Sequence, residues 1–428
     1  MGVVRGLPKT LRLKYHFSMS ASRCRFCETR LTDTVVDLGM SPLCESFLAE
    51  DQLNRAESFY PLRVEVCGNC FLVQVGEYVR AEEIFTEYAY FSSFSTSWLK
   101  HCEDYVSMIS ERLSLGAGSS VIELASNDGY LLQYFVKRGI PCLGIEPAAN
   151  VAKVARERGV PTQVAFFDKK LGVELRAAGQ QADLVLGCNV LAQIPDLNSF
   201  IAGVPEILKP TGTVTFEFPH VMRLLEGNQF DTIYHEHYSY FSLITIEKIF
   251  ARHGLTVFDV EELWTHGGSL RIYARHTKDS TRPATERLNA LRERERSAGY
   301  EKVETYTRFE GQVRETKRKL LDLLIDAKRA GKRIVGYGAP GKGNTLLNYC
   351  GIRTDFIDFT VDRNPYKHGK FLPGTHIPIL DTAQLDLAKP DYIFILPWNF
   401  KDEIMAQLAH ARDWGAKFIV PIPEATIL

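Results

Sequence analysis

The sequence contains no apolar run approaching the length of about 18 residues that a transmembrane helix needs. It also lacks an excess of either charge, since 51 lysines and arginines stand against 52 aspartates and glutamates. The net charge of −1 offers no basic surface for a nucleic-acid backbone, so we expect neither membrane nor nucleic-acid partners. With 45% apolar and 24% charged residues, the chain has the composition of a folded globular protein.

The first 20 residues lack the apolar core of a signal peptide, although they carry four basic residues and no acidic one. We interpret residues 1–20 as a flexible leader, with Met19 as a candidate internal start. The 9 cysteines are too few for a disulfide scaffold in a chain of this length. A reducing compartment, and therefore a cytoplasmic location, is the expectation.

The 428 residues predict two or three domains at about 150 residues each. Residues 21–86 carry paired cysteines and short strands with alternating apolar residues, for example at residues 60–66. Residues 87–282 and 331–428 alternate short apolar strands with helical patterns, which is typical of parallel sheets covered by helices. The predicted strands lie at residues 120–124, 142–145, 183–187 and 212–216 of the first segment and at 333–336, 356–361, 391–396 and 417–420 of the second. Residues 283–330, rich in Arg, Glu and Lys, predict one or two long linking helices. The fold class is therefore α/β, with a small N-terminal domain and two larger sheets.

Two cysteine pairs give the strongest chemical indication. Cys24 and Cys27 form one CxxC motif, and Cys67 and Cys70 form a second. Four thiolates close a tetrahedron around zinc, and a metal would stabilise a segment too short for an adequate apolar core. A redox CxxC is the alternative, but two pairs without thioredoxin-like surroundings favour structural zinc. A site closed by four thiolates leaves no open position for catalysis.

A loop of small and polar residues follows the strand predicted at residues 120–124 and precedes a helix. Small residues let a ligand approach the backbone, and the start of the helix supplies free N–H groups. A carboxylate at the end of the next strand could accept both ribose hydroxyls of an adenosine. This pattern predicts a class I S-adenosylmethionine-dependent methyltransferase; NAD is the rival cofactor, but the segment contains no GxGxxG. The candidate cofactor residues are Glu123, Ala125, Asn127, Gly129, Glu146 and Asn189.

The run Tyr234-His-Glu-His-Tyr238 concentrates two imidazoles, a carboxylate and two phenols in five residues. Such a cluster is typical of a site that moves protons. A polar surface loop and an HxH metal pair are the alternatives, although no third metal ligand has a suitable spacing. We therefore interpret the run as the catalytic segment.

The last segment contains Gly336-Tyr-Gly-Ala-Pro-Gly341, a literal GxGxxG after a predicted strand, with Asp362 further along the chain. This pattern is a fingerprint of NAD binding. Lys342 and Asn344 follow it, and a turn, a helix start and one lysine would equally bind the diphosphate of another nucleotide. Both interpretations remain open from the motif.

The order of these motifs resembles the sugar C-methyltransferases of deoxysugar biosynthesis. The resemblance extends from about residue 22 to the C-terminus and rests on the cysteine pairs, the loop at 126–129, the run at 234–237, Gly338–Thr345 and Val361–Pro365. That family methylates carbon 3 of dTDP-4-keto-deoxysugars on the way to branched antibiotic sugars. The resemblance implies a zinc-binding N-terminal domain, a class I methyltransferase domain and a C-terminal Rossmann-like domain that helps to bind the nucleotide sugar.

The resemblance also implies roles for individual residues. His237 would be the general base that forms an enolate at carbon 3, with Tyr234, Glu236 and Tyr88 around the sugar. The substrate-binding residues implied by the C-terminal motifs are Lys342, Asn344, Asp362 and Arg363. The expected partner is a dTDP-4-keto-deoxysugar, and the expected assembly is a monomer or a weak homodimer.

Two positions depart from the family pattern. Ala125 stands where the family usually has Gly, a small change for cofactor binding. Gln193 stands where the family usually has His, and an amide cannot take a proton near neutral pH. One alternative is a bifunctional enzyme that also reduces the 4-ketone with NADPH, as is thought of a related enzyme of aureolic-acid sugar assembly. A second is a non-catalytic, nucleotide-binding zinc protein.

Overall fold

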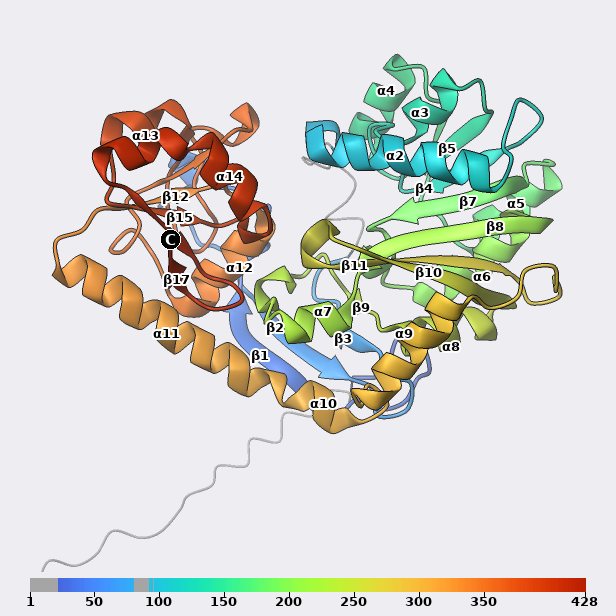
Figure 1. Cartoon of the computed structure of the whole chain (residues 1–428), viewed down its shortest axis with the longest axis horizontal. Helices are drawn as coiled ribbons and strands as arrows, with labels where there is room; N and C mark the ends of the chain where they lie inside the picture. The colour runs from blue at the N-terminus through green and yellow to red at the C-terminus, as the bar shows by residue number, and fades with distance from the viewer. Residues whose placement is uncertain (1–21, 81–91, 95) are drawn as a thin grey trace, which may run out of the picture.

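Three β-sheets organise the chain, as the computed structural model in Figure 1 shows. The structure describes residues 22–80, 92–94 and 96–428. The seven-stranded and six-stranded sheets form two lobes, and the strands of the N-terminal sheet lie between and below them in the view of Figure 1. Among the helices of these residues, none is both long and apolar enough to cross a membrane.

The N-terminal sheet is antiparallel and draws one strand from the middle of the chain. Its order is β1 (Asp33–Ser41), β2 (Tyr60–Val66), β3 (Val73–Val75) and β9 (Ser239–Tyr240). The strand predicted at residues 60–66 is confirmed as β2. Strand β9 pairs with β3 through Val73 and Tyr240, so this sheet is not completed within residues 21–86.

The seven-stranded sheet has the order β10-β11-β8-β7-β4-β5-β6. Its strands are β4 (Val121–Leu124), β5 (Cys142–Glu146), β6 (Thr162–Val164), β7 (Ala182–Cys188), β8 (Leu208–Pro219), β10 (Leu255–Leu263) and β11 (Ser269–His276). Four of them match strands predicted from apolar runs. The expectation of parallel strands holds from β6 to β8, but β11 runs antiparallel to both of its neighbours.

Helices connect and cover these strands. They are α2 (Thr96–Arg112), α3 (Leu132–Lys137), α4 (Ala149–Glu157), α5 (Lys169–Ala177), α6 (Leu197–Ile207), α7 (Val221–Glu226) and α8 (Leu243–Arg252). Several begin at polar caps: the Asp168 carboxylate accepts from the backbone N–H of Leu171 at 2.7 Å, and Asp196 accepts from that of Ser199 at 3.0 Å. These bonds satisfy N–H groups that have no partner within the helix.

Three helices form the segment predicted to link the two sheets: α9 (Glu286–Ser297), α10 (Val303–Thr307) and α11 (Phe309–Arg329). Helix α11 runs along the outside of the molecule from the N-terminal strands to the C-terminal lobe (Figure 1). In α9, the buried Glu295 accepts from the backbone N–H groups of Leu243 and Ile244 at 2.7 and 2.9 Å. This carboxylate therefore fixes the linking segment to the start of α8.

The six-stranded C-terminal sheet has the order β14-β13-β12-β15-β16-β17 and is parallel except for β17. Its strands are β12 (Ile334–Tyr337), β13 (Thr360–Asp362), β14 (Ile379–Asp381), β15 (Tyr392–Ile395), β16 (Lys417–Val420) and β17 (Thr426–Ile427). Helices α12 (Gly341–Cys350), α13 (Ala383–Ala388) and α14 (Lys401–Gln407) accompany them. Buried residues of β1 and β2 belong to the same apolar core as β12 and β15, so the N-terminal and C-terminal sheets are packed together.

Candidate active site

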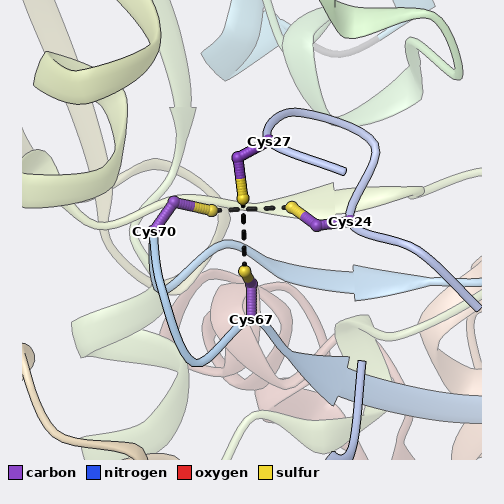
Figure 2. Close-up of side chains that lie close together, drawn as sticks. All are labelled: Cys24, Cys27, Cys67 and Cys70. Carbon is purple, nitrogen blue, oxygen red and sulfur yellow. Dashed lines mark hydrogen bonds between the residues drawn. The ribbon is translucent and has the colours of Figure 1, made fainter. Parts of the chain in front are cut away.

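The side chains of the four paired cysteines point toward one another, as Figure 2 shows, and none of them lines the cavity described below. Their sulfur atoms all lie within 4.8 Å of one another, and the Cys24–Cys70 and Cys27–Cys67 pairs are 3.5 Å apart. Zn–S bonds of about 2.3 Å in a tetrahedron would separate the sulfurs by about 3.8 Å. The ligand set and spacing therefore fit one zinc ion, and the prediction of a four-cysteine site is confirmed.

A cavity of about 440 Å³ lies where the three parts of the chain meet. Cys44 and Glu45 line it from the N-terminal part, whereas the loops after β4, β5, β6 and β7 line it from the central sheet. Strands β5 and β6 lie on one side of β4, whereas β7 and β8 lie on the other, so the cavity opens at the switch point of the sheet. Ligands of α/β sheets bind at this position.

The predicted cofactor residues Ala125, Asn127, Glu146 and Asn189 all line the cavity. The Glu146 carboxylate, at the end of β5, accepts from the backbone N–H groups of Asn127 and Ala148 at 2.8 and 2.9 Å. Burial raises its pKa. A carboxylate fixed in this way retains lone pairs for the two ribose hydroxyls of an adenosine. The adjoining small and aromatic residues leave room for the adenosine. These residues therefore fit S-adenosylmethionine.

Two predicted cofactor residues do not line the cavity. Glu123 lies inside β4 with no exposed surface, and burial raises its pKa well above the usual value. Gly129 has a φ of 76°, and a Cβ there would lie 2.9 Å from Cγ2 of Val160. Its lack of a side chain is thus required by the backbone and by packing against Val160, rather than by a ligand.

The catalytic segment lies on the cavity wall with Tyr234, Glu236 and His237. Nε2 of His237 is 3.0 Å from the Tyr234 hydroxyl, and the two rings are 4.1 Å apart. The imidazole also hydrogen-bonds to the backbone of Thr232. Burial and the nearby His266 lower the pKa of His237 to about 3, so the ring is neutral at pH 7 and keeps the lone pair that a base needs.

Glu236 lies among groups from the N-terminal part of the chain. Its Oε1 is 3.6 Å from the Cys44 thiol, which donates to it. Burial and the neighbouring Glu45 raise the pKa of Glu236 to about 8, because two carboxylates in a buried space repel each other. Glu236 is therefore a protonated acid at neutral pH, able to donate as well as accept a hydrogen bond.

Gln193 also lines the cavity, at the end of the short helix Leu191–Gln193. The carbonyl of the preceding Ala192 accepts from the backbone N–H of Tyr238 at 2.7 Å. This bond holds the Gln193 turn against the catalytic segment. The cavity therefore holds His237, the base candidate, together with the amide of Gln193 at the position where the family usually has a histidine.

Lys342 enters the cavity from the start of α12. Its Nζ donates to Oδ1 of Asn399 at 2.8 Å and lies 4.9 Å from the Trp398 ring centre. The indole N–H of Trp398 donates to the buried Asp231 at 2.6 Å, and burial raises the pKa of Asp231 to about 6. Burial lowers the pKa of Lys342, whereas Asp231 raises it. A half-buried lysine held in this way is suited to an anionic ligand.

The GxGxxG turn has structural reasons for its glycines. A Cβ on Gly341 would lie 2.8 Å from the sulfur of Cys44, and one on Gly338 would lie 2.6 Å from Cδ of Pro397. The turn amide of Ala339 donates to Asp362 at 2.7 Å. The Gly341 amide hydrogen-bonds to Glu45. Protein groups therefore occupy turn amides that a dinucleotide phosphate would use.

Only one of the three remaining predicted substrate residues of the C-terminal part lines the cavity. Asp362 lines the cavity, but Asn344 and Arg363 do not. Asn344 is 1% exposed, and its amide has no hydrogen-bond partner among the residues described. Arg363 is exposed. Tyr88 lies outside the described residues.

Among the cavity residues that sequence patterns missed, three carry titratable groups close to the predicted ones: His266, Cys44 and Glu45. His266 lies in the turn Thr265–Gly267 between β10 and β11, and its Nε2 is 2.7 Å from the amide nitrogen of Asn189. A histidine directly before two glycines, between two strand patterns, was the available indication of an unusual turn. Cys44 and Glu45 do not belong to any recognisable sequence motif.

Comparison with known protein families gives three matches along the chain. Residues 24–85 match a putative zinc binding domain, residues 98–260 a methyltransferase domain, and residues 264–423 a C-methyltransferase C-terminal domain. The C-methyltransferase NovU of Streptomyces niveus is 36% identical over 407 residues, which cover 95% of this chain and 96% of that protein.

More distant similarities concern only part of the chain. A ubiquinone biosynthesis O-methyltransferase of Acinetobacter baylyi is 31% identical over 103 residues, or 23% of this chain and 43% of that protein. An S-adenosylmethionine-dependent methyltransferase structure from Clostridium acetobutylicum covers 42% of this chain and 92% of that chain, with 16% identity and a TM-score of 0.35.

None of these matches supports the NADPH-dependent alternative. The match to NovU runs through the zinc site, the cofactor loop and the C-terminal sheet alike. The resemblance drawn from the motifs is confirmed: the chain is an S-adenosylmethionine-dependent C-methyltransferase and belongs to the C-methyltransferase family that includes NovU.

Proposed function

We propose that this enzyme transfers a methyl group to carbon 3 of a dTDP-4-keto-deoxysugar, with His237 as the base. The observation that carries the proposal is the neutral His237 on the wall of a cavity shared with Glu146 and Lys342. A proton beside a ketone is acidic because its removal leaves charge on oxygen, and a positioned imidazole can remove it. S-adenosylmethionine would supply the electrophilic methyl group.

The hydrogen bonds of His237 support its role. The bond to the Thr232 backbone favours a proton on Nδ1, because a carbonyl only accepts. Nε2 is then the nitrogen with a lone pair, and the Tyr234 hydroxyl lies 3.0 Å from it. Tyr234 therefore orients the base nitrogen and could pass a proton to it, a role that the family resemblance does not specify.

The charges of the cavity support a nucleotide sugar as the substrate. Lys342 contributes a half-buried cation from the C-terminal part of the chain, whereas Glu146 comes from the central sheet. We assign Lys342 to the diphosphate and the region around Tyr234, Glu236 and Gln193 to the sugar. Protonated Glu236 could donate to a sugar oxygen, and Gln193 could hydrogen-bond a hydroxyl or ketone without taking up a proton.

The test is incubation of the enzyme with S-adenosylmethionine and a panel of dTDP-4-keto-deoxysugars, followed by mass measurement of the nucleotide sugar. The expected product is heavier by one methylene, and NMR should locate the new carbon–carbon bond at carbon 3. In heavy water without the cofactor, the hydrogen at that carbon should exchange. Methylation at oxygen or at another carbon would contradict the proposal.

A further inference from the structure

His266 is a cavity-lining imidazole without a role in the mechanism proposed above. Its φ of 53° lies in the left-handed region, where a residue with a side chain is strained. Such a conformation persists only when neighbouring groups hold it, and it is concentrated at functional positions. The bonds around His266 and the groups that face it therefore decide what the residue can do.

Hydrogen bonds hold the turn on both sides of His266. The Thr265 hydroxyl donates to the buried carboxylate of Glu217 at 2.8 Å. The backbone N–H of Gly268 donates to the Thr265 carbonyl at 2.9 Å, and the Gln229 amide donates to the Gly267 carbonyl at 2.7 Å. The strained backbone is thus fixed from the adjoining strand and from the loop before the catalytic segment.

The side chain of His266 is fixed as well. The amide nitrogen of Asn189 lies 2.7 Å from Nε2, and the Trp98 ring packs 5.4 Å from the imidazole. Because the amide nitrogen donates, Nε2 accepts, and the neutral ring carries its proton on Nδ1. Among the residues described, Nδ1 has no hydrogen-bond partner. The ring therefore carries a donor on the cavity wall for which the described part of the chain supplies no acceptor.

The same cavity receives His237 and Lys342 from two other elements. A charge on His266 lowers the pKa of His237, and Lys342 lowers the pKa of His266, so the three groups lie close enough to affect one another. Glu217 and His101 act on His266 from β8 and α2. Since the Tyr234 hydroxyl is already bonded to the base nitrogen, His266 joins Glu236 and Gln193 as a donor available to an oxygen that becomes negative.

We propose that His266 is a second catalytic residue of this site, and that its Nδ1–H donates to the ketone oxygen while His237 removes the neighbouring proton. The inference rests on the proposed function. The carbon–hydrogen bond breaks, its proton moves to His237, and its electron pair delocalises onto the ketone oxygen, where His266 keeps its proton and stabilises the charge. That pair then forms the carbon–carbon bond as the methyl–sulfur bond breaks, leaving a neutral thioether.

Two substitutions separate this role from simple positioning of Asn189. The side-chain amide of Asn overlies Nδ1 of a histidine, whereas that of Gln overlies Nε2. In His266→Gln the amide oxygen can therefore take the place of Nε2 and accept from Asn189. The Nδ1–H donor is lost, which should lower both exchange at carbon 3 and methyl transfer by about 10²–10³-fold. His266→Asn tolerates the left-handed backbone, restores the donor and should retain within about tenfold of the activity.

The opposite order, with His266→Gln active and His266→Asn inactive, would overturn the proposal and leave His266 as a positioning residue. So would a His266→Gln enzyme that has lost methyl transfer but exchanges the hydrogen at the normal rate. His410→Gln, at an exposed site, is the matched control. Thermal melting and S-adenosylmethionine affinity check that each variant is folded.

A measurement on the unsubstituted enzyme covers the case in which both variants fail to fold. In ¹⁵N-histidine-labelled protein, a neutral ring protonated on Nδ1 should shift when the dTDP-4-keto sugar binds beside S-adenosylhomocysteine. A His266 ring protonated on Nε2, or unaffected by the sugar, would overturn the inference. If the enzyme itself neither exchanges nor methylates carbon 3, the proposed function fails instead, which is a different result.

Discussion

The hydroxyl of Tyr234 lies 3.0 Å from Nε2 of His237, with the two rings 4.1 Å apart. The phenol therefore occupies the direction in which the proposed base nitrogen would receive a proton. Either the sugar displaces this hydroxyl, or the hydroxyl relays the proton to the ring. The kinetics of single substitutions distinguish these two pathways.

His237→Asn is expected to abolish exchange at carbon 3 together with methyl transfer, because loss of a general base costs about 10²–10⁴-fold. Tyr234→Phe should lower both rates if the phenol relays the proton, but should affect mainly sugar affinity if it is displaced. Deuterium incorporation followed by NMR measures the first step directly. Exchange that survives in His237→Asn would remove His237 from the base role.

Restoring the usual family residue with Gln193→His should not rescue His237→Asn. Gln193 lines the same cavity. The hydrogen bonds to Tyr234 and to the Thr232 backbone, however, are made by the side chain at position 237 and would not orient a histidine at position 193. The single variant Gln193→His should remain folded and may be compared with the double variant in the same assay. A double variant that regains exchange would show that either position can hold the base.

Glu236→Gln should change the pH dependence of stability. Burial raises the pKa of Glu236 to about 8, above its usual value near 4.5, so between these values the folded enzyme binds a proton that the unfolded chain lacks. The free energy of unfolding should therefore fall as pH rises from about 4.5 to 8, and this contribution should vanish in the variant. Urea unfolding at pH 5, 6.5 and 8 measures the difference. A variant that loses stability relative to the parent as pH rises would contradict it.

Cys67→Ser should remove the zinc ion and destabilise the N-terminal sheet, because the binding energy of a structural metal is part of the folding energy. Elemental analysis should give about one zinc per chain for the parent and less for the variant. Cys350→Ser, at a buried cysteine away from the cluster, is the control for loss of a thiol. Unchanged melting of metal-free protein would refute the structural role.

Glu146→Ala should weaken S-adenosylmethionine by about 1.5–3 kcal/mol, the range for a hydrogen bond to a charged group. Part of that loss should come from the loop, since the carboxylate also holds the amides of Asn127 and Ala148. Asp362→Ala, in the C-terminal sheet, should leave cofactor affinity unchanged and weaken the nucleotide sugar. Calorimetry that gives the reverse assignment would mean that the two nucleotide sites are interchanged.

Gly341→Ala should destabilise the enzyme by about 1–3 kcal/mol, because the new Cβ would lie 2.8 Å from the Cys44 sulfur. Removing that sulfur with Cys44→Ala should recover part of the loss, which a double-mutant cycle in urea would measure. Additive effects would show that the glycine serves another purpose, such as room for a nucleotide phosphate.

Local patterns predicted much of the fold because strands and metal ligands are encoded over short distances. The alternation at 60–66 and the apolar run at 417–420 became β2 and β16 with the same bounds. The direction of β11 was not predictable in this way, because apolar alternation does not specify which neighbour a strand pairs with or in which direction.

The candidate site was predictable where chemistry and spacing coincide, as in the run from Tyr234 to His237. It was not predictable where the fold brings together distant residues without a motif, such as Glu45 beside Glu236. The GxGxxG pattern is the converse case: Gly341 is explained by its approach to Cys44, a contact across almost 300 residues that no local pattern contains.

The pairing of β9 with β3 has a consequence for how this enzyme could be divided or recombined. Ser239 directly follows the run Tyr234–Tyr238, and it pairs with Gln74, four residues beyond the last zinc ligand. A chimaera that exchanged the zinc-bearing segment alone would have to reproduce this strand pairing, or the segment that carries His237, the proposed base, would lose its pairing with β3. The zinc-bearing and methyl-transferring parts therefore share one sheet, although family comparisons divide them.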